Sequence, residues 1–134
     1  MRRGPVALLF ALSLAACARQ EAPEDVGVCW RVHPGASGAV SFTPLARDVA
    51  NLETCAVLLE GLRLQGQAQT DGAFQGYFIF VDEGTMSSAR HAQGFRYPIF
   101  QPPQRAEVDR DLQRLMRERG GQLPDASELA LERK

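Results

Sequence analysis

The sequence has neither an excess of one charge nor a long apolar segment. Its 134 residues include 15 Lys and Arg against 16 Asp and Glu, and only 7% of them are aromatic. This near-neutral balance is unlike that of dedicated nucleic-acid-binding proteins, which carry an excess of basic residues. The composition also lacks the bias that marks fibrous and largely disordered chains. What remains is an ordinary globular composition with the length of one domain.

Motifs for metal binding and catalysis are equally scarce. The chain has only two histidines, His33 and His91, each isolated in a predicted polar loop, and only three cysteines. A zinc site needs three or four converging ligands, which this set does not offer. There is no H-E-x-x-H sequence, no phosphate-binding Gly-rich loop and no dinucleotide fingerprint. We therefore expect neither a metal site nor a cofactor.

The N-terminal residues 1–16 have the layout of a secretory signal. Arg2 and Arg3 precede an apolar run over residues 6–16 that only Ser13 interrupts. A positive start, a short apolar stretch and small residues at its end are shared by signal peptides. As a helix the run covers about 17 Å, which is too short for a hydrocarbon layer about 30 Å thick. The segment therefore predicts export and cleavage rather than a membrane span.

The end of this run, Leu14-Ala15-Ala16-Cys17, resembles the lipobox of bacterial lipoproteins. The resemblance implies that the Cys17 thiol receives a diacylglycerol, that residues 1–16 are removed, and that the new amino group is acylated with a fatty acid such as palmitate. Two or three acyl chains anchor a protein firmly to a bilayer. Ala18 is not the Asp that retains lipoproteins of enteric bacteria at the inner membrane, which implies the periplasmic face of the outer membrane. The alternative is a soluble exported protein cut at the same site.

Assigning Cys17 to lipid leaves Cys29 and Cys55 as an even pair in an oxidising compartment. Cys55 lies on the apolar face of a predicted helix and Cys29 lies in a predicted strand, so both can face one core. We predict a disulfide between them, which would stabilise the fold by about 3 kcal/mol. The alternative is two buried free thiols.

Apolar periodicity predicts four strands and two helices. The expected strands are residues 26–32, 39–42, 76–82 and 95–100, and the expected helices are residues 52–65 and 104–119. Asn51 is the predicted cap of the first helix, and Gly61 within it indicates close approach to another element. The strand at 76–82 is apolar on both faces and should be central, whereas Pro98 places the last strand at an edge. Residues 85–94 are expected to form a loop or a short helical turn.

This order of elements predicts an α+β fold, a small two-layer sandwich in which two helices cover one face of a mostly antiparallel sheet of about four strands. Residues 26–121 form the predicted domain. Residues 17–25, which contain the lipidated cysteine, read as a flexible tether. Residues 122–134 are expected to be a peripheral tail, weakly helical from Asp125.

Seven of the ten aromatic residues lie between positions 74 and 100. One interpretation is a sheet face packed beneath the helices. The other is an exposed recognition surface, because tyrosine tolerates partial exposure to water. That surface would consist of Tyr77, Phe95 and Tyr97, flanked by Arg90 and Arg96.

Two short resemblances bear on a partner. The Trp-x-x-x-Pro spacing of Trp30 and Pro34 is similar to a motif in accessory lipoproteins of the outer-membrane barrel-assembly machine. The helix over residues 51–65 and the strand after it are similar to half of a sporulation-related peptidoglycan-binding domain, in fold alone. We expect an envelope protein or peptidoglycan as the partner, and the slightly acidic charge balance argues against nucleic acid.

We therefore expect a lipid-anchored envelope protein whose periplasmic domain acts by binding. Two alternatives stay open at this point. A small envelope hydrolase could use scattered groups such as Asp82, Ser88 and His91, which a shared pocket would reveal. A structural spacer would need no ligand surface at all, and a sizeable exposed apolar patch would argue against it.

Overall fold

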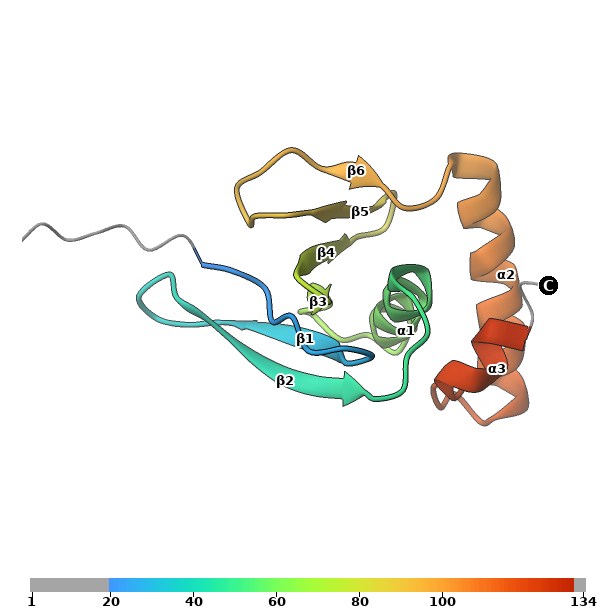
Figure 1. The fold of residues 1–134 in the computed structure, drawn as a ribbon. Coiled ribbons are helices and arrows are strands. Elements are labelled where there is room, and N and C mark those ends of the chain that lie inside the picture. Colours follow the sequence, from blue (N-terminus) through green and yellow to red (C-terminus); the bar gives the residue numbers. More distant parts are fainter. Residues whose placement is uncertain (1–19, 132–134) are drawn as a thin grey trace, which may run out of the picture.

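The computed structural model describes residues 20–131, and it shows an α+β fold built on one antiparallel sheet. The predicted signal peptide and Cys17 lie outside the described residues. The strands are β1 (Cys29–Pro34), β2 (Val40–Ala46), β3 (Gly72–Phe74), β4 (Tyr77–Val81), β5 (Met86–Ala89) and β6 (Tyr97–Pro98), and the helices are α1 (Leu52–Leu64), α2 (Pro102–Glu118) and α3 (Ala126–Leu131). The sheet order is β2-β1-β3-β4-β5-β6 (Figure 1).

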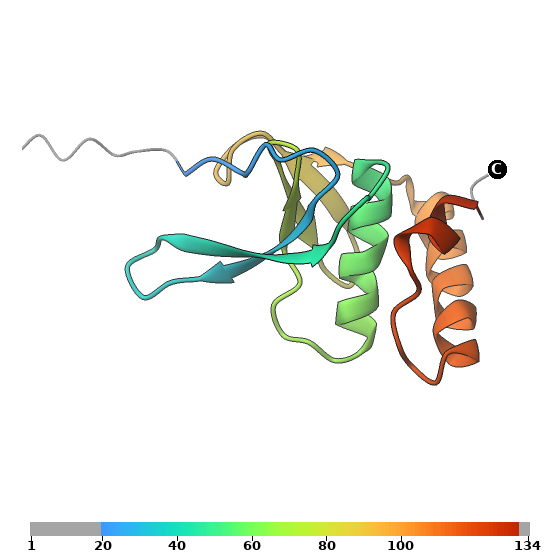
Figure 2. The same cartoon turned by 60° about the horizontal axis from the view of Figure 1, so that its bottom comes forward.

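The layers differ from the predicted two-layer sandwich. Helix α1 packs on one face of the sheet, against β1, β3 and β4. Helices α2 and α3 lie on the far side of α1 (Figures 1 and 2). This arrangement follows from α1 itself, because Thr54 to Leu62 are all buried and so need neighbours on every side. The tail that was expected to be peripheral contributes to this core, since Leu129 of α3 is only 6% exposed.

The expected number of strands was too low because two strands lack a recognisable pattern. Strand β3 has only three residues, and β5 replaces the expected loop or helical turn with the sequence Met-Ser-Ser-Ala. Neither segment carries apolar alternation of useful length. Their strand conformation comes from neighbours, since β3 pairs with β1 and β4, and β5 pairs with β4 and β6. Strand β4 is central and β6 is at the edge, as predicted.

Helix α1 begins at its predicted cap. The Asn51 Oδ1 accepts hydrogen bonds from the backbone N–H of Thr54 at 2.9 Å and from its hydroxyl at 2.7 Å. Gly72 lets the helix approach β3, because a Cβ at this position would lie 2.5 Å from a Cδ atom of Leu59. The close approach predicted at Gly61 is also present, since a Cβ there would collide with Leu123.

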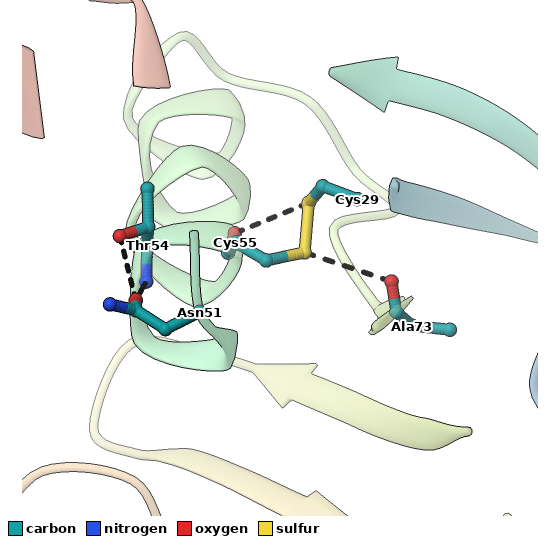
Figure 3. Close-up of a disulfide and its surroundings, with 5 residues drawn as sticks. All are labelled: Cys29, Asn51, Thr54, Cys55 and Ala73. Atoms are coloured by element: carbon teal, nitrogen blue, oxygen red, sulfur yellow. Dashed lines mark hydrogen bonds between the residues drawn. A yellow bond between two sulfur atoms is a disulfide. The ribbon is translucent and has the colours of Figure 1, made fainter. Parts of the chain in front are cut away.

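The predicted disulfide between Cys29 and Cys55 is confirmed (Figure 3). It joins β1 to α1 across a Cα–Cα distance of 5.3 Å, and both residues are fully buried. The sulfur of Cys55 also contacts the carbonyl oxygen of Ala73 in β3 at 3.7 Å (Figure 3). The disulfide therefore fixes α1 over the middle of the sheet.

A buried ion network connects α1 with α2. The carboxylate of Glu60, which is fully buried, accepts hydrogen bonds from Arg63 and from Arg105 Nη2 at 2.9 Å. Arg105 Nη2 also donates to the Asp82 carbonyl oxygen, and Arg105 Nε donates to the Asp109 carboxylate at 3.1 Å. The hydrogen bond to Glu60 raises the pKa of Arg63 above its ordinary value. The network thus links both helices to the turn after β4.

The N-terminal segment, residues 20–25, is bound to the sheet although its composition predicted a flexible tether. The side-chain amide of Gln20 donates to the Val40 carbonyl oxygen at 2.7 Å and accepts from the Val40 N–H at 2.9 Å. Ala22 is 5% exposed, and the Pro23 carbonyl oxygen accepts from the Gly76 N–H at 2.8 Å. An amide side chain carries both a donor and an acceptor, so Gln20 can pair with the free edge of β2 as another strand would.

Candidate functional site

Three aromatic side chains of the β4 to β6 region face solvent. Phe95 is 75% exposed, Tyr97 is 62% exposed and Tyr77 is 43% exposed, whereas Phe74 and Phe78 are buried. Both interpretations of the aromatic-rich region therefore apply, each to different residues. Single exposed apolar side chains are common, but Phe95 and Tyr97 touch each other, with ring centroids 4.9 Å apart in an edge-to-face arrangement.

The pairing register shows which of the five candidate residues share a face. Ile79, Ser88 and Tyr97 are paired across β4, β5 and β6, so their side chains point to the same side of the sheet. Ile79 belongs to the core beneath α1, which identifies this side as the α1 face. Alternation along a strand repeats every second residue, which places Tyr77 on the same face as Ile79.

Arg90 and Phe95 join this face through their contacts. The guanidinium of Arg90 lies over the Tyr77 ring, 5.2 Å from its centroid, and Phe95 packs on Tyr97. We call Tyr77, Arg90, Phe95 and Tyr97 the aromatic surface. Arg96 lies on the opposite face of the sheet, where its guanidinium stacks 3.7 Å from the Phe80 ring centroid.

Arg90 is the polar centre of the aromatic surface. Its Nη1 donates to the Gly76 carbonyl oxygen at 3.3 Å, and its Nη2 lies 3.6 Å from the carboxylate of Glu24 in the N-terminal segment. The ion pair with Glu24 is exposed, so it holds the side chain only weakly. The surface therefore offers aromatic rings beside a cation. Such a surface suits partners that are apolar or that combine apolar and polar groups.

The opposite face carries a small polar cavity of about 300 Å³ that the sequence did not reveal. Its lining includes Asp71, Asp82 and Arg96. Burial raises the pKa of Asp71 above its usual value, although the Val81 N–H, at 3.3 Å, and the charge of Arg96 oppose the shift. Asp71 precedes β3, and because that strand was not predicted, nothing in the pattern indicated that this carboxylate would be half-buried.

Asp82, the other carboxylate of the cavity, is stabilised in its ionised form. The Thr85 N–H donates to Asp82 Oδ1 at 2.7 Å, and this bond is the main reason that the pKa of Asp82 lies below its usual value. Asp82 Oδ1 also accepts from the Gly84 N–H at 3.0 Å. Its principal partners thus belong to the turn between β4 and β5.

Asp82, Ser88 and His91 do not assemble into a catalytic group. Asp82 precedes β5 and His91 follows it, so the two lie at opposite ends of a strand that is about 10 Å long. No hydrogen bond among residues 20–131 joins any two of the three. The other histidine, His33, was expected in a loop but lies in β1. Its Nε2 forms a hydrogen bond with the hydroxyl of Thr43 at 2.7 Å.

Two further findings concern the described part of the chain. No three His, Cys, Asp or Glu side chains come together there in a way that could hold a metal ion. Within residues 20–131, every helix is too short or too polar to cross a membrane.

Comparison with known proteins adds no relative to this picture. The chain matches no family model, and searches of curated proteins and of solved structures find no match either.

Proposed function

We propose that this protein is a lipid-anchored lipoprotein of the bacterial cell envelope whose small domain acts by binding. Residues 1–16 direct export, and Cys17 carries the lipid that holds the mature chain on the periplasmic face of the outer membrane. The support is the match of Leu14-Ala15-Ala16-Cys17 to the lipobox. A disulfide between the two remaining cysteines is what an oxidising compartment favours.

The observation that supports binding is the aromatic surface. Phe95 and Tyr97 are mostly exposed and touch each other, next to a cation–π pair of Arg90 and Tyr77. Aromatic residues and Arg are enriched where proteins meet partners. A spacer without a ligand needs no such cluster. A hydrolase needs catalytic groups that converge, and Asp82, Ser88 and His91 do not converge. We propose an envelope protein or peptidoglycan as the partner.

Site-specific crosslinking in intact cells tests this proposal. A photoreactive phenylalanine analogue would replace Tyr97 in the aromatic surface, and in a matched control it would replace Gln113, an exposed residue of α2. We expect light-dependent adducts of one envelope protein, or of peptidoglycan fragments, from position 97 only. Equal adducts from both positions, or none from position 97, would contradict binding through this surface.

A further inference from the structure

The bond between Gln20 and Val40 limits how far the domain can lie from a lipid on Cys17. Only Ala18 and Arg19 separate Cys17 from Gln20. Three residue steps span at most about 10 Å, even when fully extended. Because both polar groups of the Gln20 side chain pair with the backbone of Val40, the start of β2 stays close to the lipidated residue.

The N-terminal segment enters the domain at the end opposite α2 and α3. In both views it lies at the end where the turn between β1 and β2 and the turn between β5 and β6 are found, while α2 and α3 occupy the other end (Figures 1 and 2). The contacts agree with the views. Ala22 packs in one cluster with Ala92 of the β5 to β6 turn, and Glu24 pairs with Arg90 at the start of that turn.

The chemistry of this end suits the boundary between lipid and water. Its most exposed aromatic side chain is Phe95, which has Tyr97 beside it and Arg90 and Arg96 close by in the sequence. Aromatic rings settle at the headgroup level of a bilayer, and Arg side chains can keep their charge in water while their stems lie on apolar surface. The turn between β1 and β2, residues 35–39, is largely exposed and uncharged.

We propose that this end of the domain rests on the lipid bilayer, with Phe95 in the interface between headgroups and acyl chains. The inference rests on the proposed lipid anchor. It assigns Phe95 to the bilayer and leaves Tyr77, Arg90 and Tyr97 of the aromatic surface to the partner proposed above. Glu21 and Asp25 are exposed acidic residues of the N-terminal segment, so the contact depends on the anchor and on Phe95 and not on attraction to anionic lipids. Helices α2 and α3 then point away from the membrane, toward the periplasm.

Tryptophan quenching by brominated lipids tests the orientation. The lipidated protein would be purified from membranes and placed in phosphatidylcholine vesicles, a share of whose acyl chains carry bromine. The parent protein has a single tryptophan, Trp30, which supplies the baseline. Phe95→Trp adds a reporter at the proposed contact, and Gln113→Trp adds a matched reporter on α2. The mass of the N-terminal peptide is measured on the same samples.

We expect a loss of emission and a blue shift for Phe95→Trp beyond the baseline, and neither for Gln113→Trp. Adding Gln20→Ala to Phe95→Trp removes both bonds to Val40, so it should reduce the quenching. If Cys17 carries lipid but the Phe95→Trp variant is quenched no more than the parent protein, the orientation is wrong while the anchor stands. Stronger quenching of the Gln113→Trp variant would also overturn it. An N-terminal peptide with the mass of bare protein would refute both the anchor and the inference.

Discussion

The buried carboxylate of Glu60 should be a major determinant of stability, and Glu60→Gln tests this with almost no change in shape. Glu60 is fully buried, and Arg105, its partner on α2, is only 7% exposed. Loss of the negative charge leaves Arg105 with Asp109 as its remaining ionic partner, while its Nη1 is already without a hydrogen bond among the described residues. Removing one partner of a buried ion pair costs about 3–5 kcal/mol. We expect a loss near the lower limit, because Asp109 remains.

Urea unfolding of the mature protein with its disulfide intact measures this loss. With a slope of about 1.5 kcal/mol per molar urea, a loss of about 3 kcal/mol lowers the midpoint by about 2 M. Glu118→Gln is the matched control, because Glu118 forms an exposed pair with Arg114 and should contribute under about 1 kcal/mol. Midpoints that fall equally in Glu60→Gln and in the control would refute the reasoning.

Replacing Cys29 and Cys55 together with Ala should lower the unfolding free energy by about 3 kcal/mol through the loss of the closed loop; an unchanged urea midpoint would argue against this. Alkylation and mass spectrometry of the mature chain should find these two cysteines linked, and two free thiols would contradict the structure. Gly72→Val brings a side chain against the Trp30 carbonyl oxygen of β1 and against Leu59 of α1, so thermal melts should show a loss of at least about 1–3 kcal/mol. The pKa of Asp82 is lowered by its bond from the Thr85 N–H, so this carboxylate stabilises the fold above its unfolded-state pKa of about 4. That contribution is lost as the pH falls through the lower folded-state pKa, and Asp82→Asn should reduce the acid sensitivity of unfolding; an unchanged acid limb would count against it.

Local signals in the sequence were sufficient for the elements that carry them. Asn51 followed by an apolar face marked the start of α1, and the unbroken apolar run of β4 marked a central strand. The disulfide followed from counting cysteines and from the inward face of Cys55. The residues that determine α1 lie within one or two helical turns of each other, and those that determine β4 lie within the strand itself.

Other features depend on distant neighbours and have no local signal in the sequence. Strands β3 and β5 form because partner strands pair with them, and their own sequences favour no strand. The division of the candidate surface, which places Arg96 on the far face, depends on the register between β5 and β6. The docking of the N-terminal segment needs Gln20 to meet Val40, 20 residues away, and a polar composition alone indicates only flexibility.

The central claim is that Cys17 anchors this domain to a membrane. Mass spectrometry of the N-terminal peptide of the mature protein tests this claim most directly. The protein would be purified from the membrane fraction of its expressing cells, in parallel with a Cys17→Ser variant. The account predicts a mature chain that begins at Cys17 and carries the added mass of a diacylglycerol and an amide-linked acyl chain. A mature chain that begins at another residue, or an unmodified Cys17, would contradict it.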